Sequence, residues 1–167
     1  MQTEKERVTQ RLMSLSIAMM RADAALEAYH RERAKFAKST LSEDELVVQL
    51  DRQLLRVENS DFTLARAHLT IWFAMLYVVI EGWRKWKFFD SGVDPLLTSE
   101  HVAELRAHRH AVFHAENFDV PAVMQFVASP ERSKWVADIS NTLRQAIRDW
   151  NANFPNRFTE YLVRSEL

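Results

Sequence analysis

Residues 62–89 read "FTLARAHLTIWFAMLYVVIEGWRKWKFF", and they contain the longest apolar run of the chain, Leu69 to Ile80. Apart from Thr70, this run presents apolar side chains on nearly every face of a helix, which is typical of a helix surrounded by protein. We therefore predict either a central core helix packed among other helices or a helix shared with a second subunit. The run is too short to cross a bilayer and charged residues follow it at once, so no membrane span is expected.

Amphipathic patterns on both sides of this stretch predict further helices. Ser42 and Glu45 form a capping-box pattern that begins one of them, and Asp61 and Pro130 mark two other starts. A short helix is expected near Pro121. The expected long helices cover residues 3–38, 42 to about 57, about 62–89, about 99–116 and 130–153.

Residues 90–99, "DSGVDPLLTS", are predicted to form the clearest loop, because Gly92 and Pro95 both break helices. Thr98 or Ser99 is expected to cap the helix that follows. The connections as a whole are short, which favours neighbouring helices that pack antiparallel.

Two glycines and four prolines in 167 residues leave few places for the tight turns of hairpins. We therefore predict an all-α fold, a single helical bundle of about five to six helices that spans residues 1–167 as one domain. The absence of cysteine excludes disulfides and thiolate metal sites. Pro155 should end the last long helix, and the tail from Asn156 is either a final short helix or an arm that docks on a partner.

A formal net charge of −1 means that no global electrostatic attraction draws the chain to polyanions, so nucleic-acid contact requires a local basic patch. The first residues, "MQTEKERVTQ", are charged and lack the apolar segment of a secretion signal. We expect a cytoplasmic protein that does not associate with membranes.

Four of the six histidines, His101, His108, His110 and His114, fall within fourteen consecutive residues of a predicted helix. Imidazole titrates near neutral pH and can donate or accept a proton there. The arginine of "RHAVFH", Arg109, carries a planar guanidinium that donates two hydrogen bonds to phosphate oxygens and stays charged. These residue types match the needs of RNA cleavage without a metal.

The order arginine, polar residue, three further residues, histidine in "RHAVFH" resembles the signature of the HEPN superfamily of small all-helical domains, many of which are metal-independent ribonucleases. The resemblance implies an endoribonuclease that leaves 2′,3′-cyclic phosphate and 5′-hydroxyl ends and needs no metal or cofactor. It implies that Arg109 holds the scissile phosphate, His114 transfers protons and His110 assists as the polar neighbour. It also implies a homodimer whose two motifs face each other, acting on RNA.

The same resemblance implies a toxin of a toxin–antitoxin pair or an effector of phage defence, with an antitoxin or regulatory protein as partner. One HEPN subgroup, paired with a nucleotidyltransferase antitoxin, has a tyrosine two residues after the motif histidine. Glu116 occupies that position here, so this chain departs from that subgroup.

Helical geometry constrains the motif. At about 100° per residue, Arg109 and His114 lie about 140° apart around the axis, whereas His110 and His114 lie only about 40° apart. One straight helix therefore does not aim Arg109 and His114 at one point. Either the helix is distorted near the motif, or a second copy completes the site across a two-fold axis.

A local basic patch is present in "GWRKWK", residues 82–87, where Arg84, Lys85 and Lys87 alternate with tryptophans. This mixture can pair phosphates and stack bases, and Arg106 near the motif adds a further cation. The favoured reading of this segment is a helix C-terminus where cations complement the dipole and tryptophans pack inward. Glu81 directly precedes the patch, and nothing in the sequence assigns it a role in orienting a motif side chain.

The sequence matches metal-binding and phosphate-loop motifs less well than it matches the HEPN motif. His110 and His114 have the i, i+4 spacing of a helical metal pair but lack the glutamate of a zincin, and "EAYH", residues 27–30, has no second copy for a di-iron site. Two glycines exclude a glycine-rich phosphate loop. The serious alternative is a non-catalytic, HEPN-like helical module that binds a protein or nucleotide within a larger complex.

Overall fold

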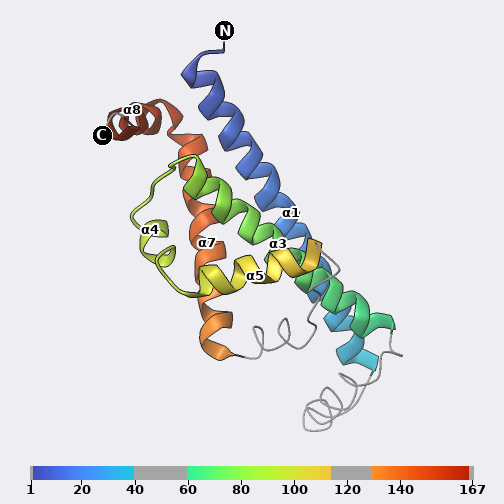
Figure 1. Ribbon diagram of the computed structural model, residues 1–167. Coiled ribbons are helices and arrows are strands. Elements are labelled where there is room, and N and C mark those ends of the chain that lie inside the picture. Colours follow the sequence, from blue (N-terminus) through green and yellow to red (C-terminus); the bar gives the residue numbers. More distant parts are fainter. Residues whose placement is uncertain (1, 40–59, 114–128, 166–167) are drawn as a thin grey trace.

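The computed structural model describes residues 2–39, 60–113 and 129–165, and these residues form helices and no strand (Figure 1). The predicted all-α bundle of about five to six helices is confirmed. The helices predicted to begin at Ser42 and near Pro121 lie outside the described residues. The described helices are α1 (Glu4–Ser39), α3 (Ser60–Lys85), α4 (Val93–Leu96), α5 (His101–Phe113), α7 (Pro130–Ala152) and α8 (Phe154–Ser165).

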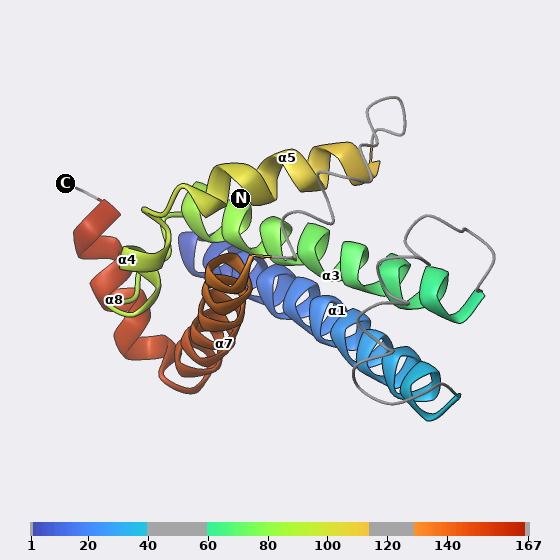
Figure 2. The same ribbon diagram turned by 90° about the horizontal axis from the view of Figure 1, so that it is seen from below.

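Helices α1 and α3 lie side by side and run in opposite directions, as the two views show (Figures 1 and 2). The two helices approach each other closely at Gly82, near the C-terminal end of α3, where an added Cβ would come within 2.8 Å of Leu15 Cδ2 of α1. Helix α5 packs on α3, and α7 crosses the α1–α3 pair rather than running parallel to it. The antiparallel packing predicted from short connections therefore holds for α1 and α3 but not for α7.

Helix α3 ends four residues earlier than the predicted Phe89, because the chain turns at Lys87. Lys87 adopts the left-handed conformation with φ of 55°. The amide of Phe88 donates to the carbonyl of Trp83 and that of Lys87 to the carbonyl of Arg84, both at 3.1 Å. The Phe88 and Trp83 rings lie 5.5 Å apart. This is a Schellman motif with its apolar contact. Lysine occupies the position where glycine is usual, so the sequence contains no glycine signal for the end of this helix.

A Lys87→Gly substitution is expected to stabilise the protein by about 0.5–1 kcal/mol, because glycine adopts positive φ without the Cβ clash. The free energy of unfolding in urea measures the gain. Lys85→Gly is the matched control. Lys85 is the last residue of α3, so glycine should there destabilise the protein by up to about 1 kcal/mol. A loss of stability in Lys87→Gly would show that the lysine side chain outweighs the backbone strain.

The segment 90–99, predicted as a loop, contains the short helix α4. The side chain of Asp90 accepts hydrogen bonds from the amides of Gly92 at 2.8 Å and Val93 at 3.4 Å, which holds the turn that begins it. Pro95 is tolerated because it lies in the first turn, where its missing N–H is not needed. The predicted cap at Ser99 is confirmed, since its Oγ accepts from the amide of His101 at 3.2 Å.

Helix α7 begins where it was predicted, with Ser129 as N-cap and Pro130 in the first turn. It ends at Ala152, one residue before the predicted end, and Pro155 lies in the first turn of α8. The tail is thus a final helix, the first of the two predicted alternatives.

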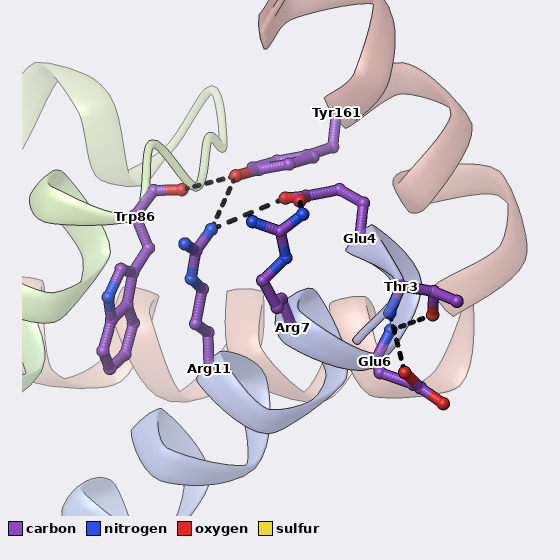
Figure 3. Close-up of polar contacts among 7 residues, drawn as sticks. All are labelled: Thr3, Glu4, Glu6, Arg7, Arg11, Trp86 and Tyr161. Atoms are coloured by element: carbon purple, nitrogen blue, oxygen red, sulfur yellow. Dashed lines mark hydrogen bonds and ion pairs between the residues drawn. The ribbon is translucent and has the colours of Figure 1, made fainter. Parts of the chain in front are cut away.

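A hydrogen-bond chain joins the start of α1, the end of α3 and α8 (Figure 3). Tyr161 donates its hydroxyl to the carbonyl of Trp86 at 3.1 Å and accepts from Arg11 Nη1 at 3.3 Å. Glu4 lies 3.7 Å from Arg11 Nη1, and a capping box of Thr3 and Glu6 holds the first turn of α1. Because all three helices meet here, α8 is packed against the bundle by a specific polar contact as well as by Tyr161 burial.

Helix α3 is the central helix, yet one of its faces points outward. Residues Leu64–Lys85 are long and apolar enough to cross a membrane by length and composition, a test that core helices of soluble proteins also pass. Leu76, Ile80 and Trp83 are fully buried in the core. Ile71 and Leu64, in contrast, are 44% and 48% exposed. Among the described residues, protein therefore covers α3 on most but not all of its sides.

Candidate functional site

The motif falls at the end of α5, where Arg109 and His110 belong to the helix and His114 lies just outside the described residues. The predicted angle between Arg109 and His114 therefore stays a prediction. The structure describes residues 109–113 of the motif. Their position is set by the packing of α5 on α3.

The guanidinium of Arg109 lies between two aromatic rings, with its Cζ 5.9 Å from the centre of Tyr77 and 6.0 Å from that of Phe113. Its Nη1 is 3.8 Å from Glu81 Oε2, a distance that allows attraction but no hydrogen bond. Both side chains are partly exposed, at 38% and 48%, so this ion pair is weak and exchangeable. Glu81 thus lies beside the motif arginine, a contact that the sequence did not indicate.

No described residue accepts a hydrogen bond from the Arg109 guanidinium, and its Nε is buried without a partner in the described part of the chain. Guanidinium carries five N–H donors and is always charged. The Nη groups of this partly exposed side chain therefore keep donors available for an anionic ligand, which is the chemistry expected of a phosphate-binding arginine, whereas the buried Nε is not accessible to one.

One flank of α5 gathers cations and an aromatic ring. Arg106 and His110 are four residues apart, as are Arg109 and Phe113, and at about 100° per residue all four lie within about 100° of the helix circumference, on one side of the helix. Arg106 and His110 are exposed, and Phe113 is 57% exposed. This flank presents positive charge and a planar surface to solvent, two features that single-stranded nucleic acids bind.

His108 belongs to the core and not to this flank. It is buried, its Nε2 lies 3.4 Å from the carbonyl oxygen of Thr70, and its ring meets the edge of Phe73 at 5.4 Å. Burial lowers the pKa of His108, and the hydrogen bond to Thr70 opposes that shift only in part. His108 is therefore a neutral packing residue near pH 7.

His101 also has a structural partner. Its Nδ1 lies 2.8 Å from Glu104 Oε2, Glu104 Oε1 lies 2.7 Å from Arg132 Nη2, and the imidazole packs against Trp135. This chain of contacts ties the start of α5 to α7. Of the four clustered histidines, two thus serve packing, His110 is exposed and His114 lies outside the described residues.

The depressed pKa of His108 predicts that stability falls with acidification. Below about pH 6.5 the unfolded chain protonates this histidine while the folded chain resists, so the free energy of unfolding drops by at most about 1.4 kcal/mol per pH unit from this group. Urea unfolding of the parent and of His108→Phe between pH 7.5 and 5 measures it. The variant should lose part of the pH dependence, and an identical slope in both proteins would contradict the prediction.

Two of the three cations of "GWRKWK" lie about one helical turn beyond Glu81. Arg84 and Lys85 follow Glu81 at spacings of three and four residues in the last turn of α3, whereas Lys87 lies beyond the helix end. Trp83 is fully buried, so its ring does not stack bases. The tryptophans pack inward and the cations are exposed, which matches the second reading of this segment, and the RNA-binding role of the cations stays a prediction.

Within residues 2–39, 60–113 and 129–165, no three histidine, aspartate or glutamate side chains lie close enough to hold a metal ion. The chain matches no known protein family, no curated protein and no solved structure.

Sequence reasoning missed Tyr77 as part of this site because it lies in the apolar run that predicts core. The available signal was its spacing, since Tyr77 and Glu81 are four residues apart and share one side of α3. The sequence carries no comparable signal for Phe113, whose 57% exposure is set by the packing of α5 on α3.

Proposed function

We propose that the chain is a metal-independent endoribonuclease of HEPN type, with a composite active site at a homodimer interface. The observation that carries the proposal is the Arg109 guanidinium, whose donors have no acceptor among the described residues and which lies beside the exposed His110. An arginine held by two aromatic rings and one loose ion pair is preorganised to receive a phosphate.

In the proposed reaction the 2′-hydroxyl of RNA attacks phosphorus and the bond from phosphorus to the 5′-oxygen breaks. One imidazole takes the proton from the 2′-hydroxyl and another group protonates the departing oxygen, with His114 as the main proton carrier and His110 assisting. Arg109 exchanges its 3.8 Å contact with Glu81 for the phosphate oxygens and stabilises their growing charge. The products are a 2′,3′-cyclic phosphate and a 5′-hydroxyl.

The outward face of α3 supports the homodimer. Exposed Leu64 and Ile71 are seven residues apart, and the partly buried Val78 and then Glu81 follow Ile71 at spacings of seven and three residues, so this side of α3 continues toward the contact between Glu81 and Arg109. A second copy placed on this face would bury Ile71 and Leu64 and would bring its own motif opposite the first.

Basic residues beside Arg109 extend the proposed RNA path. Arg84 and Lys85 lie about one turn from Glu81 and Arg106 lies one turn from Arg109, so these cations can contact neighbouring phosphates, while Lys87, beyond the end of α3, can contact a more distant one. Such contacts supply affinity without sequence preference. The biological role that we propose is that of a toxin or phage-defence effector controlled by an antitoxin or another regulatory protein.

RNA cleavage in excess EDTA tests the proposal. The parent protein should cut single-stranded RNA and leave cyclic phosphate ends, and His114→Ala should reduce the rate by about 10²- to 10⁴-fold. His30→Ala, which changes an exposed histidine of α1, is the matched control and should cut like the parent. A folded parent that cuts no RNA, or an active His114→Ala variant, overturns the proposal.

Complementation tests the composite site. Arg109→Ala and His114→Ala are each expected to be inactive, and a mixture refolded together should regain activity because one mixed cleft contains an intact arginine and an intact histidine. Ile71→Glu should give a folded monomer that does not cut RNA, measured by sedimentation and cleavage. An active monomer would show that the site is complete within one chain.

The alternative function, a non-catalytic helical interaction or nucleotide-binding module, is favoured by one observation. Met13, Ile17 and Met20 follow at helical spacing on α1 and are 58%, 39% and 62% exposed. On this alternative Met20→Glu abolishes partner binding in cells, whereas His114→Ala and Arg109→Ala leave the phenotype unchanged. The ribonuclease proposal expects the opposite order of effects.

A further inference from the structure

A cavity of about 330 Å³ opens between α1, α3 and α7. Its walls are mainly aromatic and aliphatic, with the rings of Tyr29, Trp72 and Phe73 among the lining residues. The Trp72 and Phe73 rings lie 4.9 Å apart and are stacked at 28° to each other. The volume is at the lower end of small-molecule sites, which suits a ligand with a single fused ring system. No described residue of α5 lines it, so the cavity is separate from the Arg109 flank.

The polar side of the cavity is built around Arg144. Its Nε donates to Asp23 Oδ2 at 3.0 Å, its Nη2 donates to Asp23 Oδ1 and, at 3.4 Å, to Ser140 Oγ, and its Nη1 donates to Asn141 Oδ1 at 2.7 Å. Asp23 raises the pKa of Arg144, so the guanidinium is held charged and in place.

Those bonds use four of the five N–H donors of Arg144. The fifth, on Nη1, has no acceptor among the described residues. Ser140 and Asn141 line the cavity beside Arg144 and add a hydroxyl and an amide. The site thus combines planar apolar walls with a fixed cationic donor, the usual composition of a pocket that orients a small ligand by one polar group.

We propose that this cavity binds a planar aromatic small molecule that carries an acceptor oxygen, with its ring against Tyr29, Trp72 and Phe73 and its oxygen on Arg144. Planarity follows from the aromatic walls, which favour a flat partner in offset-stacked or edge contacts. The acceptor follows from the remaining Arg144 donor, because a charge-assisted hydrogen bond fixes the orientation.

The cavity is separated from α5, the helix that carries Arg109, by the side chain of Phe73. Phe73 lines the cavity and its ring meets His108 of α5, which directly precedes Arg109. A ligand that contacts Phe73 therefore also changes the environment of His108. This gives the proposal a second readout inside the protein that does not depend on RNA cleavage.

The test is an NMR titration of the full chain with three probes: indole-3-carboxylate, indole and cyclohexanecarboxylate. Indole-3-carboxylate should bind with a dissociation constant of about 0.1–1 mM, in line with the binding energy available to a ligand of this size, and should shift the signals of Trp72 and of the His108 ring. Indole, which lacks the acceptor, should bind at least about fivefold more weakly, and cyclohexanecarboxylate, which lacks the planar ring, should not bind.

Two variants locate the site. Ala137→Phe fills the cavity from an exposed position of α7 and should abolish binding, whereas the matched Ala152→Phe, on the same helix but away from the cavity, should not. Arg144→Leu should make indole-3-carboxylate and indole bind equally. Three results would each overturn the proposal. They are no binding of indole-3-carboxylate to the folded parent at about 5 mM ligand, equal binding of indole-3-carboxylate and indole to the parent, and unchanged binding by Ala137→Phe.

Discussion

An Arg109→Lys variant is expected to fold like the parent and to cut RNA about 10²- to 10³-fold more slowly, the usual cost of removing one transition-state donor group. Lysine keeps the charge, but its compact ammonium lacks the planar fork that binds two phosphate oxygens at once. The fold should survive because Arg109 is 38% exposed and makes no hydrogen bond to a described residue. The measurement is kcat at saturating RNA in EDTA, beside thermal unfolding of both proteins.

Arg148→Lys is the matched control for Arg109→Lys. It makes the same chemical change at an exposed position of α7, away from the α5 flank, and should leave kcat unchanged. Parental kcat in Arg109→Lys would show that positive charge alone suffices, and the role proposed for the guanidinium fork would then be wrong.

A Trp150→Ala variant is expected to lose about 3–5 kcal/mol of stability, the cost of removing a large aromatic side chain from a closed core. Trp150 is fully buried and packs edge-on against Phe88 at 4.8 Å and Phe89 at 5.5 Å. Its Nε1 donates to the carbonyl of Phe89 at 3.2 Å, so the substitution also leaves a buried acceptor without its donor. Urea unfolding followed by far-UV circular dichroism measures the loss.

Trp150→Phe separates the two contributions. It keeps most of the apolar volume and removes the hydrogen bond, so a loss of only about 1–3 kcal/mol is expected. A Trp150→Ala protein with parental stability would mean that the segment around Phe88 and Phe89 is not packed on α7 in solution, which contradicts the core described for this end of the bundle.

Most helices were predictable because their signals are local. The apolar spacing in α1 and the Ser129–Pro130 start of α7 depend only on neighbouring residues, and both helices begin within one residue of the prediction. The end of α3 was not predictable, because Lys87 adopts positive φ without being a glycine. The contact between Phe88 and Trp83 that accompanies that turn forms only once the chain is folded.

Of the candidate site, too, only the features that depend on neighbouring residues were predictable from the sequence. Sequence alone determined the helical fold class, the presence of an arginine and a polar histidine in one motif, and the absence of thiol chemistry, because composition and short spacings suffice for these. Tertiary structure decided that His108 is buried while His110 is exposed, and that Arg109 lies between Tyr77 and Phe113 beside Glu81. The physical reason is that burial and pairing depend on which side of α5 packs against α3, and that packing joins residues far apart in the sequence, Glu81 with Arg109 and Thr70 with His108.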